Sequence, residues 1–449
     1  MSKIVIQNGI IVNENRTFKG SILIVNDQIQ EISETPLHYK TDVTIDADGK
    51  LIFPGIIDDQ VHFRTPGLTH KGDIESESKS AVAGGVTSYL DMPNVNPPTT
   101  SIELLQQKVE LANQVSWANF GFYLGATNFN IEEIKKINPK EICGVKIFMG
   151  SSTGNMLVDN TETLEQIFAQ SPVLIAIHSE DESIIRRNIS SSIERYCENI
   201  PMDQHPKIRS EEACYKSTEK AIEMALRHGS KLHILHISTA KEIELLKSLT
   251  SQQREKITAE VCIHHLWFTQ DDYSKLGTLI KWNPAIKTTK DREALREAVR
   301  DNIISIIATD HAPHTLEEKQ KPYLQCPSGA PMVQHSLIAM LELVKQNIFT
   351  YEQIVEKMCH APARLFNIDR RGYLKENYFA DITIVNPRKE IKITSDNIFY
   401  KCGWSPLLNE KFSHTVETTI VNGEIVYSQG KFFKPNGKKL IFNTLKSPS

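Results

Sequence analysis

The segment Ile303-Ile304-Ser305-Ile306-Ile307-Ala308-Thr309-Asp310-His311-Ala312-Pro313-His314 joins a short apolar strand to a run of polar, ionisable residues. The same pattern recurs along the middle of the chain, where short apolar strands alternate with longer amphipathic helices. We expect strands at 87–92, 120–124, 144–149, 173–178, 231–237, 257–262 and 303–308, and clear helices at 102–115, 218–228 and 241–249. Seven or eight such units in succession predict an α/β fold, a (β/α)8 TIM-like barrel.

The two ends of the chain have a different character, because both contain short strands separated by turn residues. In the first 52 residues the turn signals are Asn8-Gly9 and Asp48-Gly49. Near the other end, Asn422-Gly423 lies between two apolar runs and is typical of a two-residue hairpin. We therefore expect a small β-sandwich domain formed by residues 1–53 and 372–449, and a barrel formed by residues 54–371.

Composition excludes several classes of function. The 449 residues are 40% hydrophobic and 24% charged, as in ordinary globular proteins. A net charge of −4 gives no basic surface for nucleic acid or for an anionic membrane, and no apolar run approaches the roughly 20 residues of a membrane span. The seven cysteines are scattered without a CxxC pair, which predicts reduced thiols in a cytoplasmic protein.

Polar residues of the kind that bind metals or substrates follow the expected strands. The active sites of such barrels lie at these carboxyl ends of the strands. Each residue alone is more often structural, but a set at five strand ends is hard to produce by chance. The segment Asp58-Asp59-Gln60-Val61-His62-Phe63-Arg64 supplies three of them, because alternate side chains share one face of a strand. The set is Gln60, His62, Arg64, Asn94, Lys146, His178, His236 and Asp310.

Metal-assisted hydrolysis is the chemistry that needs this set. Two divalent cations about 3.5–4 Å apart can share a water and lower its pKa. Lys146 lies within an apolar strand, where burial depresses the pKa of an amine. The neutral amine can react with carbon dioxide to form a carbamate that bridges the metals. Asp310 can bind one metal, act as general base, and later protonate the leaving nitrogen.

Other polar residues in these segments have ordinary structural interpretations. Asp59 should point away from the pocket and could replace a missing ligand only if the strand bulges there. His264 and His265 look like a ligand pair, but adjacent residues on a strand face opposite sides. We therefore expect structural roles for both histidines.

The chain resembles the amidohydrolase superfamily of metal-dependent hydrolases and, within it, the dihydroorotases. The most specific motif is the segment 308–319, which begins Ala308-Thr309-Asp310-His311-Ala312-Pro313-His314. Further matching motifs are Pro54-Gly55-Ile56-Ile57-Asp58, Arg64-Thr65-Pro66-Gly67, Met92-Pro93-Asn94, Lys146-Ile147-Phe148-Met149-Gly150-Ser151-Ser152, His233-Ile234-Leu235-His236-Ile237-Ser238, Asn283-Pro284-Ala285-Ile286-Lys287, Ala380-Asp381-Ile382-Thr383-Ile384-Val385 and Val421-Asn422-Gly423. The resemblance covers essentially the whole chain.

The resemblance implies a zinc-dependent enzyme that reversibly cyclises N-carbamoyl-L-aspartate to L-dihydroorotate in de novo pyrimidine (UMP) synthesis. One or two zinc ions are implied. His62, Lys146 as N6-carboxylysine, and Asp310 would hold the first, and Lys146, His178 and His236 the second. The implied substrate contacts are Arg64, Asn94, Asn283 and His314. Asp310 is the implied catalytic residue.

The sequence departs from the dihydroorotase pattern at three places. Gln60 stands where the first histidine of a His-x-His motif is usual, and glutamine is a poor zinc ligand, so we expect it to bind a metal weakly through its amide oxygen or to hold a water. Thr65 stands where an acidic residue is common. The segment 327–333 matches only loosely the glycine-rich loop expected near the substrate, which it could cover through backbone groups.

Two other functions therefore remain open. One is another cyclic amidase, an allantoinase or a dihydropyrimidinase (hydantoinase). The other is a non-catalytic, dihydroorotase-like partner of aspartate transcarbamoylase. Arg64 favours dihydroorotase, because a guanidinium can bind the ring carboxylate of dihydroorotate through two hydrogen bonds. We expect a small-molecule substrate, no nucleic acid or membrane partner, and a homodimer as the commonest assembly.

Overall fold

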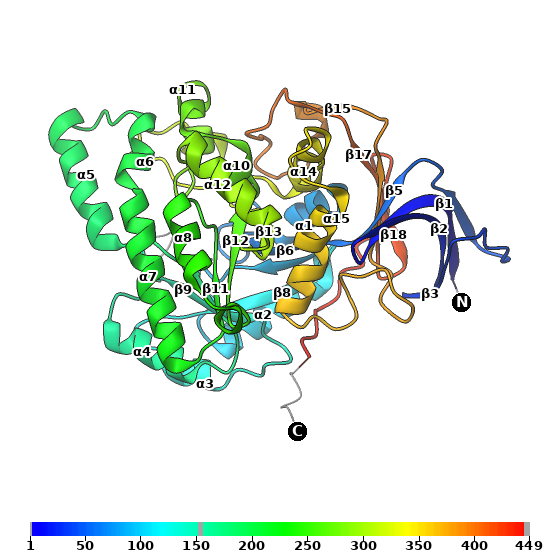
Figure 1. Ribbon diagram of the computed structural model, residues 1–449, viewed down its shortest axis with the longest axis horizontal. Coiled ribbons are helices and arrows are strands. Elements are labelled where there is room, and N and C mark those ends of the chain that lie inside the picture. The colour runs from blue at the N-terminus through cyan, green and yellow to red at the C-terminus, as the bar shows by residue number, and fades with distance from the viewer. Residues whose placement is uncertain (1, 151–155, 444–449) are drawn as a thin grey trace.

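Eight parallel strands from the middle of the chain form a barrel in the computed structural model, which describes residues 2–150 and 156–443 (Figure 1). They are β6 (Ile56–Val61), β7 (Val86–Asp91), β8 (Asn119–Gly125), β9 (Gly144–Phe148), β10 (Ile175–His178), β11 (Leu232–Ile234), β12 (Ile257–Cys262) and β13 (Ile306–Ala308). Hydrogen bonding follows chain order from β6 to β13, and a bridge between Val61 and His311 joins the last strand to the first. The expected (β/α)8 barrel is confirmed.

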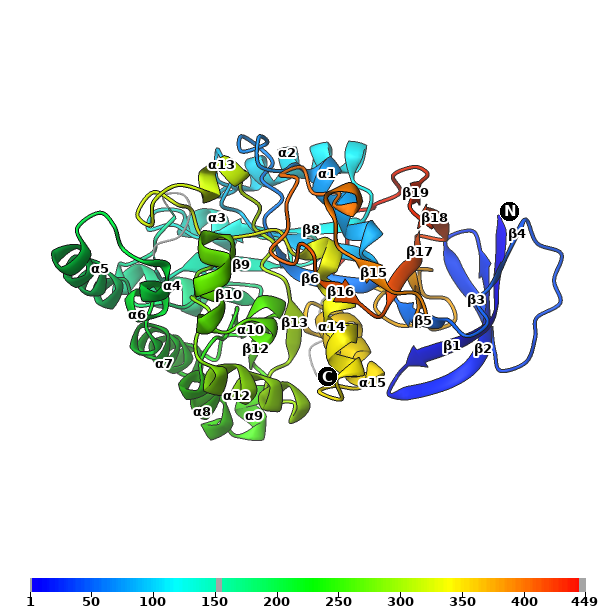
Figure 2. The same cartoon turned by 90° about the horizontal axis from the view of Figure 1, so that it is seen from above.

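Helices surround this barrel on its outer side (Figure 2). The helices are α1 (Ile74–Ala83), α2 (Ile102–Val115), α3 (Ile131–Lys135), α4 (Thr161–Gln170), α5 (Glu182–Tyr196), α6 (His205–Ile208), α7 (Glu211–His228), α8 (Ala240–Ser248), α9 (Ser251–Arg254), α10 (Ile263–Trp267), α11 (Tyr273–Leu276), α12 (Thr289–Arg300), α13 (Leu316–Lys319), α14 (Ser336–Lys345), α15 (Tyr351–Val355) and α16 (Ala361–Leu365). The sequence sets their limits locally. For example, the Ser210 side chain caps the first turn of α7, and Gly229 ends that helix in the left-handed conformation.

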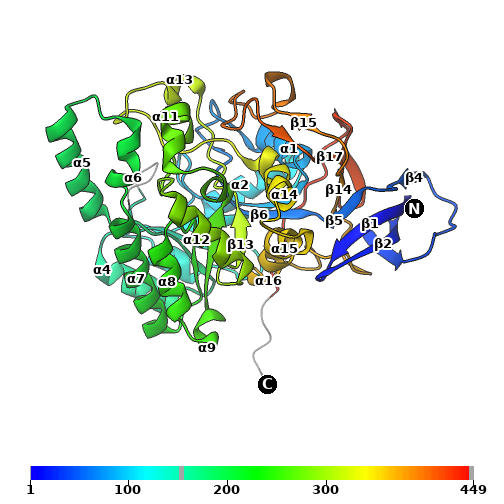
Figure 3. The same cartoon turned by 45° about the horizontal axis from the view of Figure 1, so that its top comes forward.

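Strands from both ends of the chain meet in one nine-stranded sheet beside the barrel (Figure 3). From the N-terminal part come β1 (Lys3–Asn13), β2 (Arg16–Val25), β3 (Gln28–Ser33), β4 (Val43–Asp46) and β5 (Leu51–Pro54), and from the C-terminal part β14 (Ile382–Asn386), β17 (Thr415–Val421), β18 (Glu424–Ser428) and β19 (Lys431–Phe432). The junction is antiparallel pairing of β14 with β5. Two short strands, β15 (Ile391–Lys392) and β16 (Lys411–Phe412), pair separately. The exact domain limits at residues 53/54 and 371/372 stay a prediction.

Two turn signals near the ends of the chain have different outcomes. Asn422 and Gly423 both have positive φ and connect β17 to β18, so the expected hairpin is confirmed. The turn expected at Asn8-Gly9 is wrong. Strand β1 continues through it, and a register shift between Ile6 and Gly9 absorbs the positive φ of Asn8 as a bulge.

Several smaller features bear on the other expectations. All seven cysteines are free thiols. Among the described residues, no helix is both long and apolar enough to cross a membrane. Ser151 and Ser152, the last two residues of the motif that contains Lys146, lie outside the described residues.

Candidate active site

The carboxyl ends of the barrel strands open into one polar cavity, and nine of the ten site residues expected from sequence line it. The lining residues are Gln60, His62, Arg64, Asn94, Lys146, Phe148, His178, His236, Asn283, Asp310, Ala312, Ser328 and Gly329. His314 is absent from this lining. Ser328 and Gly329 belong to the segment 327–333, which matches only loosely the glycine-rich loop expected near the substrate. The structure thus gathers residues from strands far apart in the chain, while the role of each stays a prediction.

One side of the cavity carries Lys146, His178 and His236, which are all buried. Nδ1 of His178 lies 3.0 Å from Nε2 of His236. Burial lowers the pKa of Lys146 to about 7, so its amine is readily neutral near neutral pH. Burial also lowers the pKa of His178 and takes that of His236 well below its usual range. All three side chains therefore favour uncharged forms, which are the forms that bind metals or carbon dioxide.

A buried carboxylate fixes the orientation of His178. Its Nε2 lies 3.0 Å from the Glu180 carboxylate, which also pairs with Arg209. A carboxylate behind a metal-binding histidine commonly fixes its ring orientation and tautomer. The contact directs the other ring nitrogen of His178 towards His236 and the cavity.

The opposite side of the cavity centres on Asp310. Its Oδ1 lies 3.0 Å from Nε2 of His62 and accepts a hydrogen bond from Nε2 of Gln60 at 3.2 Å. Nδ1 of His62 lies 2.7 Å from Oδ1 of Asn94, and Oε1 of Gln60 accepts a weak bond from the Cys262 thiol at 3.6 Å. Gln60 thus presents a nitrogen donor to Asp310, whereas a metal ligand would present a lone pair.

The donor set fits divalent metal ions. Among the described residues, Nζ of Lys146 and Nδ1 of His236 are buried without a hydrogen-bond partner. Buried polar atoms normally have partners, and a bound metal or a carboxylated lysine would supply them here. Three imidazoles and the carboxylate of Asp310 are ligands that zinc prefers. His62 and Asp310 would hold one ion, and His178 and His236 the other, with Lys146 between the two sets.

Arg64 reaches the cavity from a buried, left-handed backbone position with a φ of 66°. Its Nε donates to the carbonyl of Pro313 at 3.0 Å, and Nη2 lies 3.1 Å from Nε2 of His314. His314 lies beside Arg64 and is itself 3.1 Å from Nζ of Lys71. Lys71 was missed by sequence reasoning, since nothing in its local pattern distinguishes it from a surface lysine.

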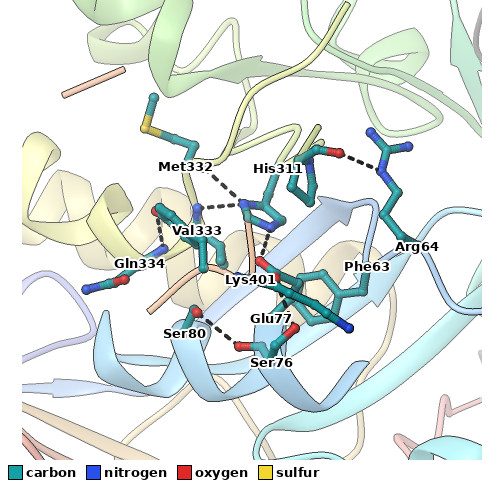
Figure 4. Close-up of polar contacts among 12 residues, drawn as sticks. Phe63, Arg64, Ser76, Glu77, Ser80, His311, Met332, Val333, Gln334 and Lys401 are labelled. Atoms are coloured by element: carbon teal, nitrogen blue, oxygen red, sulfur yellow. Dashed lines mark hydrogen bonds and ion pairs between the residues drawn. The ribbon is translucent and has the colours of Figure 1, made fainter. Parts of the chain in front are cut away.

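A second buried pair, Glu77 and His311, supports the backbone next to Asp310 (Figure 4). Nδ1 of His311 accepts hydrogen bonds from the backbone N–H groups of Met332 and Val333 at 2.9 and 3.2 Å. Its Nε2 therefore carries the proton and donates to Glu77 at 2.9 Å. Sequence reasoning assigned neither residue a role, although alternation along the strand end places His311 opposite Asp310.

One local expectation from the sequence needs correction, and a second gains detail. His264 and His265 lie in the short helix α10, not on a strand, and His264 stacks on Trp282 at 4.0 Å between ring centroids. Asp59 does not line the cavity, as expected, and its side chain instead contacts His233. The register of β6 against β7 shifts between Asp58 and Val61, and Asp59 points into the barrel interior.

Comparisons with known proteins agree with this geometry. Residues 51–426 match the Amidohydrolase family. A dihydroorotase from Methanosarcina acetivorans is 32% identical over 98% of this chain and 97% of its own length, and one from Pyrococcus furiosus is 33% identical over 97% and 96%. The solved L-hydantoinase (dihydropyrimidinase) from Arthrobacter aurescens has a TM-score of 0.93 at 25% identity, covering 98% of this chain and 100% of that one. Dihydropyrimidinase from Brevibacillus agri, at 20% identity over 99% of this chain and 100% of that one, shares the fold with a TM-score of 0.90.

The chain belongs to the amidohydrolase family. The resemblance stated from sequence, including its dihydroorotase-like motifs, is therefore confirmed. The class of enzyme expected from sequence, a hydrolase of cyclic amides, is confirmed with it.

Proposed function

We propose that the protein is a zinc-dependent dihydroorotase, which reversibly cyclises N-carbamoyl-L-aspartate to L-dihydroorotate in pyrimidine (UMP) synthesis. The observation that carries this proposal is the presence of the Arg64 guanidinium in the same cavity as Lys146, His178, His236 and Asp310. A buried arginine beside such a set suits a cyclic amide whose ring carries a carboxylate. The full-length relatives named dihydroorotase support the same choice.

Several polar residues in and beside the cavity have distinct roles in this reaction. When bound, zinc supplies Lewis-acid polarisation of the scissile carbonyl and acidifies a water. Asp310 accepts the proton of the attacking water and returns it to the ring nitrogen as the amide bond breaks. Arg64 and Asn94 bind the ring carboxylate, Asn283 presents its side-chain oxygen to a ring N–H, and His314 positions Arg64.

The finer features of the enzyme belong to the same proposal. Lys146 is N6-carboxylysine in the active state, and one or two zinc ions bind per subunit. The protein acts in the cytoplasm, as a homodimer, and aspartate transcarbamoylase is a candidate partner. Lys146 supports the first of these features, because burial favours the neutral amine that reacts with carbon dioxide.

One observation favours another cyclic amidase as the second candidate. The Arthrobacter aurescens hydantoinase has the same fold along the whole chain at 25% identity. Hydantoinase substrates lack the ring carboxylate and therefore have less need of a buried arginine in the cavity. A non-catalytic role for the protein is the third candidate, because Gln60 stands in the cavity where the expected metal set would have an imidazole.

A substrate comparison with zinc-loaded protein tests the proposal. Hydrolysis rates should be measured for L-dihydroorotate, hydantoin and dihydrouracil, with Asp310→Asn as the inactive control. We expect turnover of dihydroorotate well above that of the uncharged rings. A preference for an uncharged ring would establish the second candidate. A folded, zinc-loaded protein without turnover of any ring would establish the third.

A further inference from the structure

Asp59, His233 and Glu260 meet inside the barrel without lining the active-site cavity. They come from three different strands, β6, β11 and β12, and each side chain is fully buried. Nε2 of His233 lies 3.2 Å from Oδ2 of Asp59 and 3.3 Å from Oε2 of Glu260. One ligand atom from each residue lies within 4.8 Å of the other two.

The tautomer of His233 is set by Thr258. The Thr258 hydroxyl donates to the carbonyl of Leu232 at 3.3 Å, so its oxygen accepts the Nδ1–H of His233 at 2.8 Å. Nε2 of His233 therefore faces the two carboxylates with either a lone pair or an extra proton. Histidines that bind metals typically donate their other ring N–H to such an oxygen.

The two distances from Nε2 of His233 match the spacing of ligands around one shared cation. Hydrogen bonds between a charged N–H and a carboxylate are about 2.7–2.9 Å long, shorter than the separations from Nε2 of His233 to Asp59 and Glu260. Two ligands on a tetrahedral zinc ion, with bonds of about 2.1 Å, lie roughly 3.4 Å apart. Among the described residues, neither oxygen of Asp59 accepts a hydrogen bond.

The Glu260 carboxylate completes the cluster beside Asp59 and His233. Oε1 of Glu260 accepts the backbone N–H of His236 at 3.2 Å, and Oε2 lies 3.3 Å from Nε2 of His233. The Asp59 and Glu260 carboxylates therefore lie close together at a fully buried position, which is unfavourable without a cation to balance them. With a neutral His233, a divalent cation would neutralise the two charges.

We propose that Asp59, His233 and Glu260 form a separate binding site for a divalent cation of the zinc class, buried beneath the catalytic cavity. His233 supplies the nitrogen ligand, Glu260 one oxygen, and Asp59 one or both of its oxygens. The ion ties β6, β11 and β12 together. Through Glu260 it also fixes the backbone of His236, which has a φ of 41°. The site does not depend on the catalytic assignment.

Anomalous diffraction at the zinc edge tests this site without any substitution. Crystals of the full-length protein, equilibrated with zinc, should show an anomalous peak among Asp59, His233 and Glu260. This peak should be distinct from any peak in the cavity. Absence of the peak in crystals whose other zinc sites are filled would overturn the proposal.

Zinc counting in solution gives an independent result. Asp59→Asn should lose one zinc equivalent per chain relative to the unsubstituted protein. Glu242→Gln, which changes another fully buried glutamate on α8, should lose none. An unchanged zinc count in folded Asp59→Asn, or an equal loss in both variants, would contradict the site. If Asp59→Asn does not fold, the diffraction result decides.

A third variant separates this site from the proposed function. His178→Asn should lose zinc from the cavity and lose dihydroorotate hydrolysis, yet retain the ion at Asp59. If the protein proves inactive on dihydroorotate while the buried peak is present, the proposed function fails and the buried site stands. If the protein hydrolyses dihydroorotate but shows no buried peak, the buried site is wrong and the proposed function stands.

Discussion

Nε2 of Gln60 lies 3.2 Å from Oδ1 of Asp310 and donates a hydrogen bond to it. The same carboxylate oxygen lies 3.0 Å from Nε2 of His62. On this side of the cavity the candidate general base, Asp310, is therefore hydrogen-bonded to the amide of Gln60. A His-x-His pattern would place an imidazole at that position. The other side keeps His178 and His236 facing one another. The two halves of the site should consequently differ in their affinity for metal.

Replacing Gln60 by histidine should tighten the weaker of the two metal positions. An imidazole adds a lone pair where the amide now donates a proton, so the ion beside His62 and Asp310 gains a ligand. Calorimetric titration of metal-free protein with zinc should resolve a weak and a tight event, and Gln60→His should shift the weak one by at least tenfold. Gln60→Leu, which adds no ligand, is the matched control. Identical titrations of all three proteins would rule out this interpretation of Gln60.

Assembly of the metal site should depend on pH through Lys146. Its pKa, lowered by burial to about 7, means that the amine is mostly protonated below this pH and mostly neutral above it. Because only the neutral amine reacts with carbon dioxide, zinc uptake by metal-free protein in bicarbonate should rise as pH increases through about 7. Lys146→Gln should bind less zinc and show no response to bicarbonate. A bicarbonate effect that persists in this variant would place the reaction elsewhere.

Arg64→Met should weaken binding of dihydroorotate and spare uncharged rings. A charge-assisted hydrogen-bonded contact contributes about 1.5–3 kcal/mol, equivalent to a rise in KM of roughly 10- to 150-fold. Arg64→Lys keeps the charge but loses the bidentate geometry. Its KM for dihydroorotate should therefore lie between those of the unsubstituted protein and Arg64→Met. Steady-state kinetics on dihydroorotate and hydantoin give the comparison. Equal losses on both rings would mean that Arg64 acts through its bond to the Pro313 carbonyl, as a structural residue.

Glu77→Gln should lower kcat without abolishing metal binding. The substitution weakens a charge-assisted bond to His311, whose backbone adjoins Asp310, and should lower the free energy of unfolding by about 1–2 kcal/mol. Glu75 is exposed on the same helix, so Glu75→Gln should change neither kcat nor the free energy of unfolding. Denaturant unfolding and the kcat of zinc-loaded protein are the measurements. A loss of stability with kcat intact would limit the pair to a structural role.

The sequence predicted the barrel and most of the cavity because both depend on strongly periodic features. Apolar strands followed by His178, His236 or Asp310 identify the carboxyl edge of a parallel barrel, and the structure brings these side chains into one cavity. The hairpin at Asn422-Gly423 could also be predicted, because its signal lies in two adjacent residues that tolerate the positive φ that the turn requires.

What the sequence did not show depends on contacts between distant segments. Asn8-Gly9 has the composition of a turn, but pairing of β1 with β2 on both sides of it keeps the strand continuous. Asp59 turns inward because the register of β6 slips against β7, which local alternation cannot reveal. Glu77 and His311 lie 234 residues apart, so no local pattern connects them.

The pairing of β5 with β14 has a consequence for synthesis of the protein on the ribosome. Residues 51–54 pair with β1 on one edge and lead directly into β6, which carries Gln60, yet the strand that covers their other edge, residues 382–385, is made much later. A nascent or prematurely terminated chain therefore exposes an open strand edge next to the first catalytic segment. Such an edge can pair with another chain, and the complete sheet forms only after residues 382–385 have been synthesised.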